Sequence, residues 1–142
     1  MSNYITTYTR RHFDPVNPEP ADMDIKDIAH ALSMICRGNG HVSSFWSVGE
    51  HCILCAKEAA AKGYADRLVL AALLHDASEC YMSDVPRPLK QNMKQYKEQE
   101  NHLLDEELEE RQPKLHVEPD YTVRAFSEVE KEYLEIFKRY KI

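Results

Sequence analysis

The sequence predicts an all-α protein, and three observations support this expectation. Apolar residues recur at helical spacing in several stretches, helix-capping residues precede these stretches, and the one β-prone segment is short. The chain has 142 residues, so we expect a single domain over 1–142, because two hydrophobic cores would be cramped at this length. With 43% hydrophobic and 30% charged residues, the composition is ordinary for a globular protein.

Composition also excludes several classes of protein. The apolar stretches are too short to cross a bilayer and no secretory signal opens the chain, so we expect a cytoplasmic protein with no membrane partner. Four cysteines do not make a disulfide framework in a reducing compartment. The formal net charge of -6 counts against a nucleic-acid partner, which needs a basic surface.

Residues 1–22 are expected to form an irregular N-terminal wrap. Tyr4–Tyr8 is rich in aromatic and β-branched residues and predicts a short extended piece. Each of the three prolines that follow fixes φ and removes a backbone donor, which predicts a loop.

The first predicted helix spans 24–36. Asp22 or Asp24 can cap its N-terminus, and its apolar residues lie three or four positions apart, which predicts one buried face. We expect it to stop at Arg37–Gly40, because glycines after the last apolar turn commonly close a helix.

A second helix is predicted over 48–62. Ser47 is its expected N-cap, with Glu50 three residues later as in a capping box, and Gly63 ends the helix. The expected buried face carries Val48, Cys52, Cys55, Ala56 and Ala59.

A third helix is predicted over 67–81 and opened by Asp66. Its segment Leu68–Leu74 is apolar nearly all round, so we expect it in the middle of the core. Pro86 and Pro88 should break the chain after it.

Two more helices complete the expected bundle. A polar surface helix is predicted over 89–110, since it has few apolar residues, and a loop with prolines follows over 111–126. An amphipathic helix over 127–140, capped by Ser127, closes the chain. Its expected inward residues are Val129, Tyr133, Ile136, Phe137 and Tyr140.

His75 and Asp76 end the apolar part of the third helix, and His51 lies on the helix before it. A buried His–Asp pair is costly without a partner, and a divalent ion is one natural partner because imidazole and carboxylate both bind first-row ions. Adjacent helical residues point about 100° apart, so both can reach one ion only where other elements crowd the site. The other interpretation is a histidine that donates to a carboxylate within an ordinary core.

Two acids follow the pair, Glu79 one turn and Asp84 two turns after Asp76. A carboxylate near a metal can exchange a proton with bound water or with a leaving group. Acids that face solvent at a helix end would show the same spacing.

The segment Arg37–His41 has two glycines and a cation at each end. It could hold a phosphate through backbone N–H groups and Arg37, although such glycines commonly just cap a helix. Cys52 and Cys55 have C-x-x-C spacing, but no second pair exists for a zinc ribbon, so core packing is the favoured interpretation.

Together these motifs resemble the HD-domain superfamily of metal-dependent phosphohydrolases, in the small branch similar to bacterial 5'-deoxynucleotidases. The resemblance covers about residues 4–92. The segments that carry it are Ile28–Ser33, Arg37–His41, Ser47–His51, Leu73–Glu79 and Ser83–Lys90.

The resemblance implies an all-α helical bundle of the HD type and a role for each matched residue. His51, His75 and Asp76 would bind a divalent ion such as manganese, cobalt, magnesium or iron. Glu79 would be the general acid/base, and Asp84 would position the sugar or the attacking water.

The substrate phosphate, on the same resemblance, would be held by Arg37, with His41 at the other end of its loop. The implied activity is hydrolysis of a phosphomonoester such as a (deoxy)nucleoside monophosphate, so the expected partner is a small phosphorylated substrate. The resemblance also allows a homodimer, since the family often dimerises. The alternative is a catalytically silent HD-type module that binds a nucleotide or a protein through the same pocket.

One departure from the family concerns the fourth metal ligand, an aspartate on a later helix. After Asp76 the chain offers Asp84, which matches a substrate position, Asp120 in a predicted loop and Asp105 in a run of acids. The stretch 99–113 is also short for the branch. We therefore expect an open three-ligand site, with Asp105 the least unsuitable fourth ligand, and a third helix that is partly exposed.

Overall fold

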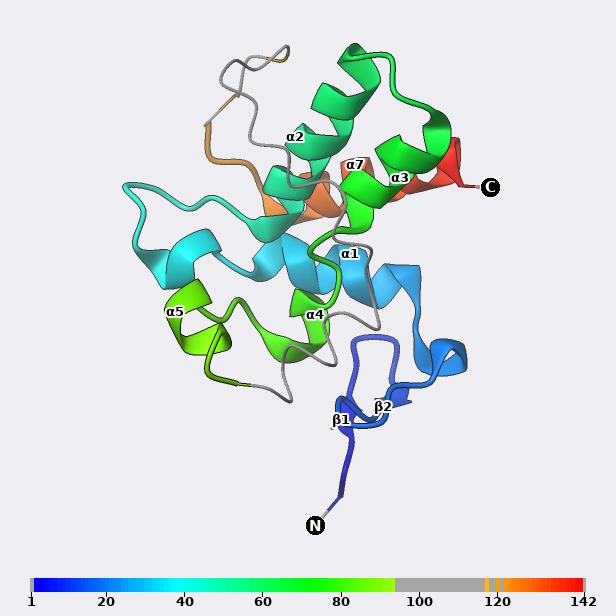
Figure 1. Cartoon of the computed structure of the whole chain (residues 1–142), viewed down its shortest axis with the longest axis vertical. Helices are drawn as coiled ribbons and strands as arrows, with labels where there is room; N and C mark the ends of the chain where they lie inside the picture. The colour runs from blue at the N-terminus through cyan, green and yellow to red at the C-terminus, as the bar shows by residue number, and fades with distance from the viewer. Residues whose placement is uncertain (1, 94–116, 118–119, 121, 142) are drawn as a thin grey trace.

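The computed structural model describes residues 2–93, 117, 120 and 122–141. Within this part of the chain, four helices, α1, α2, α3 and α7, form a bundle in which α2 and α7 each contact the other three (Figure 1). The prediction of an all-α helical bundle is confirmed. The four helices are α1 (Ile25–Met34), α2 (Val48–Ala61), α3 (Asp66–Leu74) and α7 (Phe126–Tyr140).

Short elements surround this bundle. An antiparallel hairpin opens the chain, 3-10 turns flank α1, and two single-turn helices follow α3 (Figure 1). These elements are β1 (Ile5–Thr6), β2 (His12–Phe13), η1 (Pro20–Asp22), η2 (Arg37–Gly40), α4 (Glu79–Met82) and α5 (Arg87–Lys90).

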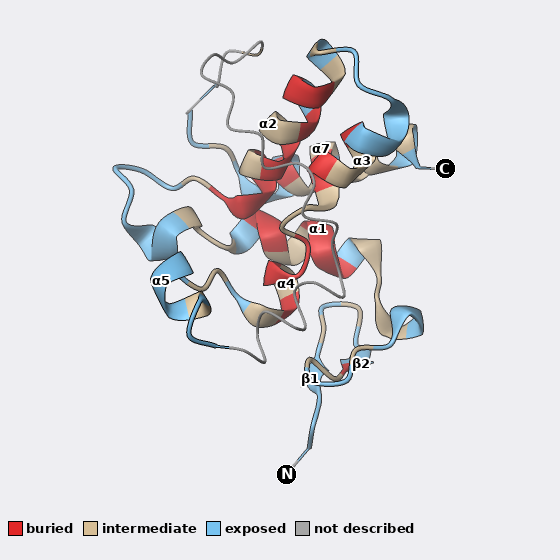
Figure 2. Cartoon of the chain, in the orientation of Figure 1, coloured by how far each residue is buried: buried red, intermediate tan, exposed pale blue. Residues whose placement is uncertain are grey.

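The core lies where α1, α2, α3 and α7 face one another, as the buried residues in Figure 2 show. Gly49 lets α2 approach α1 closely, because a Cβ there would stand 3.3 Å from the backbone of Leu32 and 3.2 Å from Val129. The largest fully buried side chains include Phe13, Leu32, Leu73, Val129 and Tyr133.

The N-terminal segment is more regular than the expected irregular wrap. The predicted extended piece pairs with a second strand, in register Ile5 to Phe13. Phe13 is 1% exposed and stacks on Tyr81 of α4, with ring centroids 3.7 Å apart. In addition, Thr9 donates to the buried Asp27 of α1 from its backbone N–H and its hydroxyl. Long-range packing therefore orders the part of the segment that precedes the prolines, whereas residues 14–19, where the loop was predicted, have no helix or strand.

The starts of α1 and α2 confirm the predicted caps. Asp24 accepts a hydrogen bond from Lys26 N at 2.9 Å, and Ser47 and Glu50 form both bonds of a capping box. The cap predicted for the last helix was wrong: α7 begins at Phe126 after Ala125, with no side-chain cap.

The third helix was predicted to run through Tyr81, and this was wrong. α3 ends at Leu74, a turn follows, and α4 begins at Glu79. The expected central position holds only in part, because Val69 and Leu73 are buried whereas Leu68 is 38% exposed. That exposure agrees with the expectation of a partly uncovered third helix.

The polar helix predicted over 89–110 falls mostly outside the described residues, as does most of the loop predicted over 111–126. The beginning of this polar helix lies within the described residues and differs from the prediction. The helix found there, α5, starts at Arg87 and ends at Lys90. No helix in the described part of the chain is long and apolar enough to span a membrane.

Candidate metal centre

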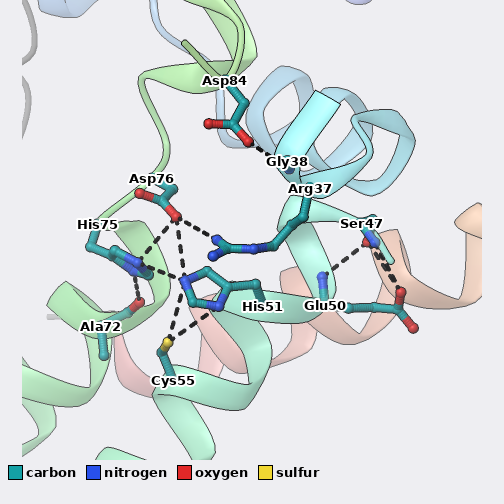
Figure 3. A network of polar contacts seen from close by, with 10 residues as sticks. All are labelled: Arg37, Gly38, Ser47, Glu50, His51, Cys55, Ala72, His75, Asp76 and Asp84. Carbon is teal, nitrogen blue, oxygen red and sulfur yellow. Dashed lines mark hydrogen bonds and ion pairs between the residues drawn. The ribbon is translucent and has the colours of Figure 1, made fainter. Parts of the chain in front are cut away.

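Two imidazoles and one carboxylate meet between α2 and the end of α3 (Figure 3). The Nε2 atoms of His51 and His75 lie 3.1 Å apart. Asp76 Oδ2 lies 3.1 Å from the Nε2 of His75 and 3.5 Å from that of His51. The structure thus brings together the three residues that the sequence predicts as metal ligands, from helices that start 18 residues apart (48 and 66).

His75 and Asp76 lie where α3 ends. His75 is the C-cap of α3 and keeps helical backbone angles (φ -60°, ψ -30°), and Asp76 lies in the turn that follows. The last carbonyl groups of a helix have no partner within it, and two of those at the end of α3 accept hydrogen bonds from side chains instead. Ala72 O accepts from His75 Nδ1 at 2.7 Å, and Leu73 O accepts from the buried Tyr133 hydroxyl at 2.9 Å.

The spacing of the three donor atoms fits a bound metal ion. An ion about 2.1 Å from each donor, with angles of about 90–110°, would separate the donors by about 3.0–3.4 Å. The observed separations are 3.1, 3.1 and 3.5 Å. The donor set of two imidazole nitrogens and one carboxylate oxygen suits first-row divalent ions.

The hydrogen bond of His75 also sets its tautomer. Because Nδ1 donates to Ala72 O, Nε2 is the atom that carries the lone pair when the ring is neutral, and it faces Asp76 and His51. Ligand histidines commonly hold their other nitrogen in this way, and the bond orients the ring before an ion arrives.

The electrostatics leave a neutral His51 beside an ionised Asp76 at neutral pH. Burial lowers the pKa of His51 to about 4, and the charge of Arg37 acts in the same direction. Burial acts to raise the pKa of Asp76, but His75, His51 and Arg37 outweigh it and lower that pKa. Burial acts to lower the pKa of His75, but its contact with Asp76 outweighs burial and raises it.

Arg37, predicted to hold a phosphate, lies beside this group. Its Nη1 is 3.6 Å from Asp76 Oδ2, and Figure 3 shows its guanidinium turned toward the carboxylate. The neighbouring Gly38 has a φ of +61° and donates its backbone N–H to Asp84 Oδ2 at 3.1 Å. Asp84 therefore holds the loop that carries Arg37.

His41, the other predicted substrate residue, is not brought to the same place. It is exposed at the end of η2, where its backbone N–H donates to Gly38 O at 3.0 Å. Its side chain is not part of the network in Figure 3. A substrate role for His41 stays a prediction.

Glu79 is buried rather than facing solvent. It is 5% exposed, and its Oε2 has no hydrogen-bond partner among the described residues. Burial first, and the negative charges of Asp76 and Asp84 second, raise its pKa to about 8. Glu79 therefore holds a proton at neutral pH, a state in which a carboxyl group can act as an acid.

The interpretation of the C-x-x-C pair as core packing is confirmed for Cys52, and Cys55 also packs against the core while its sulfur lies close to His51. Cys52 is 0% exposed within the core. Cys55 is half-buried, and its Sγ lies 3.7 Å from His51 Nε2 and 3.9 Å from Nδ1. The sequence contained the signal, because residues i and i+4 share a helix face. Burial and the negative charge of Asp76 raise the pKa of Cys55 to about 11.

The fourth ligand is the part of the prediction that the structure leaves open. Asp105 lies outside the described residues. Asp120 is exposed, and its carboxylate accepts a hydrogen bond from Thr122 N at 3.0 Å. The open three-ligand site therefore stays a prediction.

Known proteins provide an independent comparison. A family model described as an HD domain matches residues 40–141. The uncharacterized protein YfdR of Escherichia coli strain K12 is 39% identical over 103 residues, which cover 71% of this chain and 54% of YfdR. An uncharacterized protein of Rhodobacter capsulatus is 40% identical over 84 residues, covering 56% of this chain and 43% of that protein. The chain thus spans about half the length of these curated relatives.

Proposed function

This chain belongs to the HD-domain family, whose members are generally metal-dependent hydrolases, and on this premise we propose that it hydrolyses a small phosphomonoester. One observation carries the proposal. Two imidazole nitrogens and one carboxylate oxygen stand at metal-ligand separations, with a guanidinium 3.6 Å from the same carboxylate oxygen. A divalent ion and a phosphate group are the ligands that such a pairing suits.

The proposed roles follow from position. His51, His75 and Asp76 would hold the divalent ion, which when bound supplies a Lewis acid for the phosphoryl oxygen and lowers the pKa of the attacking water. Arg37 would bind the phosphate through its guanidinium, a geometry that favours oxyanions. The proposed ion is manganese, cobalt, magnesium or iron.

Glu79 is proposed as the proton donor or acceptor. Its carboxyl group is buried and, in the metal-free chain, protonated near neutral pH, so it is placed to give a proton to a leaving alkoxide or exchange one with water. Asp84 has a positioning role through Gly38 in addition to the proposed contact with the sugar or water.

A (deoxy)nucleoside monophosphate is the proposed substrate. The resemblance of residues 4–92 to 5'-deoxynucleotidases is the support for this finer assignment. The acidic net charge does not oppose it, because a bound ion and Arg37 make the local field positive.

The test is a phosphate-release screen over nucleoside and deoxynucleoside monophosphates, with each of the four metals. Hydrolysis by the wild type, lost in Arg37→Ala and kept in Arg139→Ala, an exposed arginine of α7, would support the proposal. If the protein binds a metal ion but releases no phosphate from any substrate, the alternative of a catalytically silent HD-type module is correct.

A further inference from the structure

Tyr133 of α7 brings a hydroxyl group into the core, beside the end of α3. Its side chain is fully buried, and its hydroxyl group donates to Leu73 O at 2.9 Å. Burying a hydroxyl group costs free energy unless it is hydrogen-bonded, and phenylalanine would fill nearly the same space without that cost. The hydroxyl group itself is therefore the distinctive feature of this position, and its acceptor is a backbone carbonyl.

The accepting carbonyl lies directly before the turn that carries two of the proposed metal ligands. In a continuing α-helix, Leu73 O would accept from Ala77 N, four residues later. Ala77 N donates instead to Leu74 O at 2.9 Å, so the backbone tightens here from the α to the 3-10 pattern. The turn closed by this bond contains His75 and Asp76. The hydroxyl group from α7 thus takes the carbonyl group that the tightening releases.

This hydrogen bond ties the end of α3 to the rest of the bundle. α7 packs against both α2 and α3, and α2 carries His51, the ligand on the other side of the metal centre. The Nε2 atoms of His51 and His75 are 3.1 Å apart, and their ring centroids are 5.1 Å apart (Figure 3). Ligand distances in a metal site must be correct to about 0.2 Å, so a small shift of the α3 end against α2 would weaken binding.

We propose that Tyr133 is a positioning residue for the metal centre. By bonding Leu73 O, its hydroxyl group holds the two ligands at the end of α3 at the distance from His51 at which all three bind one ion. The inference rests on the proposed function, because it takes these three residues as the ligands. In a purely structural role, the same bond would stabilise the fold and leave the affinity for metal unchanged.

The experiment compares Tyr133→Phe with Val129→Ala in the folded, chelator-treated chain. Val129 lies one turn earlier on α7 and is also fully buried, so truncating it destabilises the fold without removing the bond to α3. Mn²⁺ affinity is measured from the electron paramagnetic resonance signal of the free ion. The nuclear Overhauser effect between the ring protons of His51 and His75 is measured without metal. Circular dichroism confirms that each variant is folded at the temperature used.

Tyr133→Phe should bind Mn²⁺ at least about 10-fold more weakly than the wild type, the lower end of what the loss of an outer-shell partner costs. It should also show a weaker Overhauser effect between the two rings, because this effect falls steeply with distance. Val129→Ala should match the wild type in both measurements. Para-aminophenylalanine in place of Tyr133 offers an N–H donor to the same carbonyl and should restore both.

The inference is overturned if Tyr133→Phe keeps either the Mn²⁺ affinity or the Overhauser effect of the wild type, or if Val129→Ala loses them to the same extent. None of these outcomes affects the proposed phosphohydrolase. If the wild type binds none of the four proposed metals, the metal-dependent enzyme is wrong. The Overhauser effect in the metal-free chain then decides by itself whether Tyr133 sets the spacing of the two histidines.

Discussion

Replacing Glu79 by glutamine should remove most of the pH dependence that this side chain gives to folding. Glu79 is 5% exposed, and its Oε2 lacks a hydrogen-bond partner among the residues described. Burial, followed by the charges of Asp76 and Asp84, raises its pKa from 4.5 to about 8, although Lys90 and Arg37 act in the opposite direction. Glutamine has nearly the same shape and does not ionise.

The direction follows from proton binding in the two states. Below pH 4.5 the carboxyl group is protonated in both the folded and the unfolded chain, so its contribution to stability is fully present. Between pH 4.5 and about 8 only the folded chain keeps the proton, so stability is lost as the pH rises. The slope is about 1.4 kcal/mol per pH unit, which over the whole window amounts to about 5 kcal/mol as an upper limit.

The assay is urea unfolding of the metal-stripped protein, followed by circular dichroism between about pH 5 and pH 8. A chelator is required because a nearby cation would lower the pKa of the carboxyl group. The stability of Glu79→Gln should rise relative to the wild type as the pH increases. Glu135→Gln, a change at an exposed glutamate of α7, should run parallel to the wild type. If the Glu79→Gln and wild-type curves are also parallel, Glu79 is ionised in the folded chain and the reasoning is refuted.

Three further predictions concern the site and its support. His51→Ala or Asp76→Ala should abolish Mn²⁺ binding with little change in helical circular dichroism, because neither change opens the core; unchanged stoichiometry in both variants would remove them as ligands. Glu79→Gln should bind metal but lose turnover by a factor on the order of 10²–10⁴, the usual contribution of a general acid/base; near wild-type kcat would make it a structural acid. Tyr133→Phe should destabilise the fold by about 1–3 kcal/mol, since it leaves a buried carbonyl group unpaired. The half-buried Tyr140 is the control, and equal unfolding midpoints for Tyr140→Phe and Tyr133→Phe would contradict this.

The sequence by itself determined the features that depend on neighbouring residues. The caps at Asp24 and at Ser47 with Glu50 involve groups no more than three positions apart, so their bonds form wherever the chain begins a helix. The apolar spacing likewise predicted most of the face that α1 and α2 bury, because helical geometry alone decides which side chains share a face.

For the site, sequence motifs predicted which residues meet and not how they meet. His51, His75 and Asp76 do converge, with Arg37 beside them, and their role as ligands stays a prediction. Cys55 was assigned to packing alone, although its position four residues after His51 puts both side chains on one face of α2.

Tertiary structure contributed to where the third helix ends, beside the local bond from His75 Nδ1 to Ala72 O. The run of helix-forming residues through Tyr81 carries no local stop signal, yet α3 ends at Leu74. The carbonyl oxygen of Leu73 is bonded by Tyr133, which lies 60 residues later, and this partner exists only after α7 has packed. A helix end is stable where its free carbonyl groups find other donors, so distant packing helps to set this boundary. His75 and Asp76 lie at that boundary.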